Sequence, residues 1–242
     1  MRFLCPLLLV VVLAAPLGAD LYYIDQPAPT SLRHGEFMLS ARLQPGGGLM
    51  ARAGVGLFNR LTLGVSYGID SVLGAATPVP APLSAVGYQV RLLILDEGGW
   101  YPSLLAGFES QGYDGYRTDS SRFVTLPPGV YGVIAKTFWA TRTEVSLGGN
   151  WKPPPSPSGF DAHIAVRELY PTDWSFLVEY DAALDDPLPS TRSGDLPGLL
   201  NVGITRSLGD NLQLKFAVRD IFGHRPGNGI NRILEVAMEQ HF

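Results

Sequence analysis

The stretch AGVGLFNRLTLGVSYGID, residues 53–70, carries the pattern that decides the fold. Apolar side chains recur at every second position on both sides of Asn59 and Arg60, and the alternate positions hold mostly glycine, serine or threonine. Period-two alternation is typical of strands, and the break has about the length of a tight hairpin turn. The stretch therefore predicts two antiparallel strands, each apolar on one face. Alternation alone leaves open whether that face packs inside a soluble barrel or sandwich or faces lipid.

The same alternation recurs along the chain and predicts twelve strands. Most have close to the 9–11 residues that a tilted strand needs to cross a bilayer. Short connections mostly alternate with long ones, as in outer-membrane barrels with short periplasmic turns and long outer loops. An even strand number then puts both chain ends on the periplasmic side. The predicted strands are 35–44, 48–58, 60–69, 83–94, 100–109, 129–139, 141–151, 160–168, 173–182, 198–208, 211–221 and 231–242.

The N-terminal residues are typical of a secretory signal peptide. A single charge at Arg2 precedes an apolar run over residues 3–17, and small residues precede Asp20. The run is shorter than the roughly 20 residues of a membrane span, and two prolines interrupt it. We expect cleavage after Ala19. The predicted organisation is a signal peptide at 1–19, an N-terminal periplasmic segment at 20–34 and an all-β barrel at 35–242.

Composition excludes several classes of function. A chain of 242 residues fits one large β domain, and a net charge of −4 gives no indication of nucleic-acid binding. The single cysteine, Cys5, lies in the predicted signal peptide, so the mature chain has no disulfide, thiolate metal site or cysteine nucleophile. His163 and Asp161 share a strand face but form no triad by themselves. We expect neither enzymatic activity nor a metal or cofactor.

The polar face of the predicted strands carries charges of both signs. If the apolar face meets lipid, these charges line the lumen, where balanced signs favour pairing across the barrel over an ion-selective ring. The lumen-facing charged residues that we predict are Arg42, Arg52, Arg91, Lys136, Glu144, Asp161, Arg167, Glu179, Asp181, Lys215, Arg219 and Glu235.

Aromatic residues favour the membrane alternative. Trp100, Trp139 and Trp174 fall at the predicted periplasmic strand ends, and Trp151 falls at an outer end. Two levels of amphipathic rings are typical of interfacial girdles. The sequence ends on Phe242, and a terminal aromatic residue is common in outer-membrane barrels, where the assembly machinery recognises the last strand. We therefore predict a single antiparallel up-and-down transmembrane barrel of about twelve strands in the outer membrane.

One predicted outer loop has residues that suit surface contacts. The segment SQGYDGYRTDSSRF, residues 110–123, contains Tyr113, Tyr116, Arg117 and Arg122. Tyrosine and arginine side chains can stack on sugars or pair with the phosphates of lipopolysaccharide. An ordinary outer loop without a ligand would have the same composition.

Four segments resemble a known family of bacterial barrels: FNRLTLGVSYGID at 58–70, LLAGFESQGYDGY at 104–116, VEYDAALDD at 178–186 and NRILEV at 231–236. They are similar to the YjbH-like outer-membrane proteins linked to exopolysaccharide secretion. The resemblance implies a non-enzymatic role in envelope or exopolysaccharide export. Its implied partners are outer-membrane lipid and lipopolysaccharide, the barrel-assembly machinery and a polysaccharide. A narrow passive channel for small solutes and a soluble secreted barrel or sandwich remain the alternatives.

Overall fold

The computed structural model describes residues 20–74, 77–82, 85–117, 121–125, 127–152, 159–184, 198–224 and 231–242. Its long strands form one antiparallel sheet that closes on itself, because β1 pairs with both β2 and β15. Closure leaves no free sheet edge. No helix among the described residues is long and apolar enough to cross a membrane.

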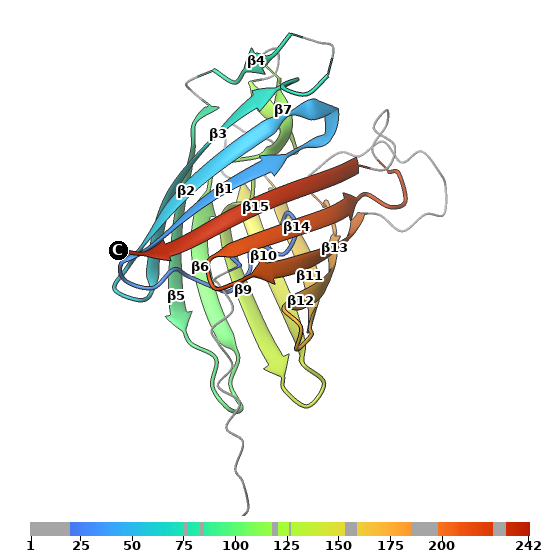
Figure 1. The fold of residues 1–242 in the computed structure, drawn as a ribbon. Coiled ribbons are helices and arrows are strands. Elements are labelled where there is room, and N and C mark those ends of the chain that lie inside the picture. Colours follow the sequence, from blue (N-terminus) through green and yellow to red (C-terminus); the bar gives the residue numbers. More distant parts are fainter. Residues whose placement is uncertain are drawn as a thin grey trace, which may run out of the picture.

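Twelve long strands of the described chain make up the barrel wall (Figure 1), which confirms the predicted fold class. Each pairs with its neighbours in chain order, as in an up-and-down barrel. The strands are β1 (Glu36–Leu43), β2 (Leu49–Leu57), β3 (Leu61–Asp70), β5 (Gly87–Leu95), β6 (Ser103–Glu109), β9 (Gly129–Phe138), β10 (Thr143–Lys152), β11 (Gly159–Leu169), β12 (Trp174–Asp181), β13 (Leu199–Leu208), β14 (Leu212–Arg219) and β15 (Asn231–His241).

Shorter elements lie in the connections on one end of the barrel. A 3-10 turn, η1 (Pro45–Gly47), joins β1 to β2, and β4 (Val79–Pro80) pairs with the end of β3. The connection between β6 and β9 forms a hairpin of β7 (Tyr113–Arg117) and β8 (Arg122–Thr125). We call this end the loop end. The other end, which carries the start of β1 and the end of β15, is the turn end.

The apolar rows of the strands point outward. Val65 is 51% exposed, whereas its neighbour Ser66 and the nearby Thr62 are buried on the inner face. Exposed apolar side chains from β5, β9, β12 and β14 continue this surface, among them Val90, Ile134, Val178 and Phe216. Soluble monomers rarely expose apolar patches larger than a few hundred Å². An apolar exterior around a polar interior contradicts the soluble alternative and matches a barrel in lipid.

The structure corrects the expected position of residues 20–34, which we call the plug. Most of the plug does not lie ahead of the barrel but inside it: residues 20–29 and Leu32 are buried, whereas Arg33 and His34 are exposed at the turn end. Tyr23 donates its backbone N–H to the Gln26 carbonyl at 3.0 Å, and Ala28 donates to the Leu21 carbonyl at 2.9 Å, so the plug is a small hairpin. Its trace, blue in Figure 1, crosses the interior of the barrel.

Apolar contacts explain why the plug lies inside. Tyr23 and Ile24 are fully buried and pack against Leu177 and Ile233, which point inward from β12 and β15. A second cluster packs Leu21, Tyr22 and Leu32 of the plug against Met38 of β1. Apolar side chains on both the plug and the wall leave water when the two meet, and this burial stabilises the closed arrangement.

Candidate functional site: the plugged lumen

The tip of the plug is held on one side by arginines. The carboxylate of Asp25 forms an ion pair with Arg42 of β1 and another with Arg219 of β14, whose Nε lies 2.5 Å from Oδ2. Arg42 also donates a hydrogen bond to the carbonyl of Ile24 at 2.7 Å. All three charged side chains are almost completely buried. Ion pairs this far from water are little screened by salt.

A carboxylate of the wall binds the backbone of the tip. Glu179 of β12 accepts hydrogen bonds from the backbone N–H groups of Ile24, Asp25 and Gln26 at 2.9, 3.0 and 2.9 Å. The amide of Asn201 donates to the same carboxylate at 2.8 Å and helps to orient it. The wall strands β1, β12 and β14 therefore all bind the tip.

The base of the plug is also held by charged groups. Asp20 accepts a hydrogen bond from Lys215 at 2.8 Å and lies 3.5 Å from Arg167. The hydroxyls of Tyr22 and Tyr23 donate to Glu109 and Glu144 at 2.8 and 2.7 Å. Lys215 donates a second hydrogen bond to the Tyr22 carbonyl at 2.6 Å. These contacts spread the attachment of the plug over strands β6, β10, β11 and β14.

Arginine side chains cover the tyrosine rings inside the lumen. The guanidinium carbons of Arg52 and Arg91 lie 4.4 and 4.5 Å from the centre of the Tyr22 ring. Arg167 lies 4.8 Å from the ring of Tyr23. Cation–π contacts of this kind contribute most when they are desolvated, as here. They give the buried arginines partners that carry no charge.

A glycine on the wall leaves room for the plug backbone. A Cβ atom at Gly56 of β2 would lie 2.0 Å from the carbonyl oxygen of Arg33, which no side-chain movement can relieve. Leu32 is fixed next to it because its N–H donates to Thr62 Oγ1 at 2.8 Å. Only a residue without a side chain fits where the plug backbone passes this close.

We expect Gly56→Ala to weaken the seating of the plug by about 1–3 kcal/mol, the usual cost of overpacking. Hydrogen exchange of the Leu32 amide should become faster, while amides in β9 and β10 should be unchanged. Gly68→Ala on β3 is the matched control, because a Cβ there would approach nothing closer than 3.8 Å. Equal exchange rates in the two variants would contradict the close approach.

The hairpin of β7 and β8 contributes to the lumen from the loop end. Arg52 donates a hydrogen bond to the Tyr113 hydroxyl at 2.7 Å, and that hydroxyl donates to the Asp25 carbonyl at 3.1 Å. Asp114 lies 2.6 Å from Arg219. Tyr113 is 2% exposed. The plug and the hairpin therefore meet in the lumen.

This arrangement corrects one predicted surface contact. Tyr113 cannot reach lipopolysaccharide, because the buried arginines of the wall draw it into the lumen as a hydrogen-bonding partner. Tyr116 packs edge-on against Phe123 with ring centres 5.1 Å apart, and Arg117 is exposed. Arg122 begins β8. A contact of the last three with sugars or phosphates remains a prediction.

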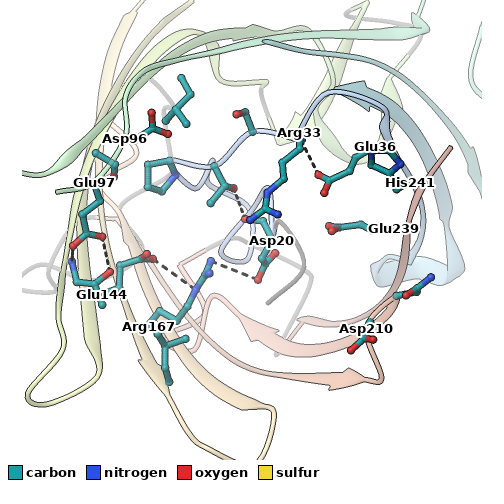
Figure 2. A pocket seen from close by; sticks show the side chains of 18 of the residues that line it. Asp20, Arg33, Glu36, Asp96, Glu97, Glu144, Arg167, Asp210, Glu239 and His241 are labelled. Carbon is teal, nitrogen blue, oxygen red and sulfur yellow. Dashed lines mark hydrogen bonds and ion pairs between the residues drawn. The ribbon is translucent and has the colours of Figure 1, made fainter. Parts of the chain in front are cut away.

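A cavity of about 850 Å³ lies between the plug and the turn end. Figure 2 shows Arg167 between Glu144 and Asp20 on one side of it, with Arg33 next to Glu36 on another. Most charged groups on its lining are carboxylates, including Asp96, Asp210 and Glu239. The cavity therefore favours cations over anions.

Glu97, which lines this cavity, lies in the turn between β5 and β6. Burial raises the pKa of Glu97, but hydrogen bonds from Lys136 and Thr137 outweigh burial and leave the pKa below its usual value. The Lys136 ammonium lies 2.9 Å from Glu97. Glu97 therefore stays ionised at neutral pH and holds the turn between β5 and β6 against β9.

The structure places eleven of the twelve charged residues predicted for the lumen on the inner wall, and it brings most of them to the plug. The prediction for Lys136 is wrong. Lys136 lies on the outward row of β9 with Ile134 and Phe138, and its ammonium pairs with Glu97 in the turn between β5 and β6. Asp161 lies next to Asp181, and Asp181 accepts a hydrogen bond from the Gln26 side chain at 2.9 Å. Glu235 lies 3.9 Å from Arg42 and 3.6 Å from Arg52.

Sequence reasoning omitted three acidic residues of the lumen: Glu109, Asp25 and Asp114. Glu109 is buried and ends β6 on the same inward row as Ser103 and Leu105, so the alternation of that strand could have identified it. Asp25 and Asp114 follow no alternation, and no comparable signal marked them.

The residues predicted for the girdle and for assembly lie near the barrel ends. Trp100 and Trp139 are exposed in turns, Trp174 begins β12 and Trp151 is the last residue but one of β10. Phe242 donates its backbone N–H to the Gly35 carbonyl at 2.9 Å. Their roles at the interface and in assembly remain predictions. Among the residues that the structure describes, no group of three His, Cys, Asp or Glu is arranged to hold a metal ion.

No family model and no curated protein matches the sequence. Solved structures do match: the KdgM porin has a TM-score of 0.50 at 11% identity, with 86% of this chain and 99% of that chain covered. The same porin in complex with disordered oligogalacturonate has a TM-score of 0.48, with 11% identity and the same coverage. The NanC porin has a TM-score of 0.44 at 9% identity, with 85% of this chain and 99% of that chain covered. At such identities the likeness concerns the fold, which this chain shares with the KdgM porin.

Proposed function

We propose that this chain is an outer-membrane channel for small polar solutes that is closed at rest by its own plug. The observation that carries the proposal is the way the plug closes the lumen. A single connection at Gly35 joins it to β1, and its tip is bound largely through polar contacts with Arg42, Arg219 and Glu179. Water replaces these contacts when the plug leaves, so the net cost of losing each hydrogen bond to a charged group is only about 1.5–3 kcal/mol.

The size of the barrel supports small solutes. Eight-stranded barrels are filled by side chains, and barrels of 16–18 strands enclose wide channels. Twelve strands lie between these limits, so an opened lumen is narrow. The apolar outer surface supports a position in lipid. We propose lipopolysaccharide as the outer neighbour of the barrel and the assembly machinery as the partner that recognises Phe242.

Export of a polysaccharide is the second candidate, favoured by the resemblance to YjbH-like proteins. An extended sugar chain would need the same withdrawal of the plug. A strain that lacks the protein would then secrete less polysaccharide while its uptake of small solutes stays unchanged. The reverse result favours the passive channel.

Glu179→Leu tests the channel directly. The substitution removes the acceptor of three backbone N–H groups in the tip, and each unsatisfied buried donor costs about 1–3 kcal/mol. Leaving the lumen hydrates these donors, so we expect at least about a tenfold rise in open probability in planar bilayers.

Asp161→Asn is the matched control for this experiment. Asp161 is also a buried inner-wall carboxylate, and the backbone groups that it accepts from belong to Ala162 and Leu184, outside the plug. The open probability of the Asp161→Asn variant should remain as low as that of the natural protein. If the Glu179 variant folds and stays closed, the plug does not control a channel.

A further inference from the structure

The plug tip occupies the lumen in the manner of a bound amino acid. Asp25 is recognised at three chemical groups. Its side-chain carboxylate pairs with Arg42 and Arg219, its backbone nitrogen donates to Glu179, and its carbonyl accepts from the Tyr113 hydroxyl. Together these contacts recognise an acid, an N–H donor and a carbonyl that belong to a single residue.

We propose that this part of the lumen, once the plug is displaced, is a binding site for acidic amino acids such as aspartate or for short peptides that contain them. The inference rests on the proposed function, because the ligand can enter only when the plug moves. In binding, the ligand replaces Asp25 at the arginines and at Glu179. The ligand and the plug therefore compete for the same groups.

The recognising groups also have partners outside the tip. Asn201 holds Glu179 at 2.8 Å, and Asp114 holds Arg219 at 2.6 Å. Arg42 lies 4.2 Å from the centre of the Tyr113 ring and 3.9 Å from Glu235. Because these contacts come from the wall and from the hairpin of β7 and β8, the site stays organised for a ligand, which lowers the cost of binding.

The two sides of the site discriminate by charge. A dicarboxylate without nitrogen can reach the arginines, but it leaves the buried carboxylate of Glu179 without the donor that the ligand should supply. An amine without a carboxylate leaves Arg42 and Arg219 without an acid. A ligand with an acid and an ammonium satisfies both groups, and a ligand that lacks either one leaves a buried charge unpaired.

The experiment uses the full chain with its tip emptied by four substitutions, Tyr23→Gly, Ile24→Gly, Asp25→Gly and Gln26→Gly. Calorimetry should detect binding of L-aspartate to this variant, with succinate at least about tenfold weaker because it lacks the ammonium group. In the same four-substitution variant, the further change Glu179→Gln should make the affinities for L-aspartate and succinate nearly equal. Arg42→Gln should weaken aspartate by about tenfold, the effect of losing a charged hydrogen bond. Lys136→Gln, away from the tip, should change neither affinity.

Three results separate this inference from the proposed channel. If the tip variant conducts in planar bilayers but binds no aspartate, or binds succinate equally well, the inference is wrong and the channel stands. If the variant binds aspartate but does not conduct, the channel is wrong and the binding site stands. If the variant does not fold, hydrogen exchange of the natural protein decides: aspartate should speed exchange at the amides of Ile24, Asp25 and Gln26, and unchanged exchange would overturn the inference.

Discussion

Barrels in which residues 21–31 are replaced by a glycine–serine segment of equal length are expected to conduct continuously, whereas the natural protein stays closed. The replacement removes the buried side chains of Leu21 and Ile24, each of which contributes about 1.5–3 kcal/mol when buried. It also removes Asp25 from Arg42 and Arg219. A loss of about 3 kcal/mol from the apolar contacts alone raises the open fraction about a hundredfold.

Single-channel recording in planar bilayers measures this difference. The equal length of the replacement keeps the connection to β1 at Gly35, so only the contacts of the plug are lost. Circular dichroism shows whether the barrel forms without them. A folded barrel that remains closed after the replacement would show that the hairpin of β7 and β8, rather than the plug, blocks the lumen.

Val65→Arg is expected to lower the free energy of unfolding by about 2–4 kcal/mol, because it places a charge near the middle of the bilayer. Val65 lies in the middle of β3 with half of its surface exposed, and its partners Ala53 and Tyr88 leave that face open. Unfolding in urea with the protein in lipid vesicles gives the free energy.

Leu61→Arg is the matched control, since Leu61 belongs to the same outward row but begins the strand. The cost of a charge falls to about 0–1 kcal/mol near the membrane surface. Equal costs at the two positions would contradict a membrane that surrounds β3 at its centre.

The barrel could be predicted from sequence because each strand carries its own pattern. In residues 53–70 the alternation defines both strands, both faces and the turn, and the observed pairing of Leu57 with Leu61 follows from that turn. The charged inner row could be predicted for the same reason. Strand ends were predicted less accurately. The strand predicted to begin at residue 100 begins at Ser103, after Pro102, which has no N–H to donate to a neighbouring strand.

The plug could not be predicted in this way because residues 20–34 have no period of their own. Their fold is set by partners far along the chain. A signal was nevertheless present, since Leu177 and Ile233 are large apolar residues on rows that face the lumen. In a water-filled lumen such residues would be exposed, so their presence indicates that something packs against them. The sequence does not show which segment that is.

The long reach of the plug contacts sets the order of events when the protein folds. Tyr22 and Glu109 are 87 residues apart, Asp25 and Glu179 are 154 apart, and Asp20 and Lys215 are 195 apart. Contacts this distant form late, because the intervening chain must first be ordered. Most of the wall must therefore exist before the plug can enter, and until then its arginines and carboxylates remain hydrated. Drying of the interior is then the last step of folding, and the plug residues, although early in the sequence, are among the last to reach their final place.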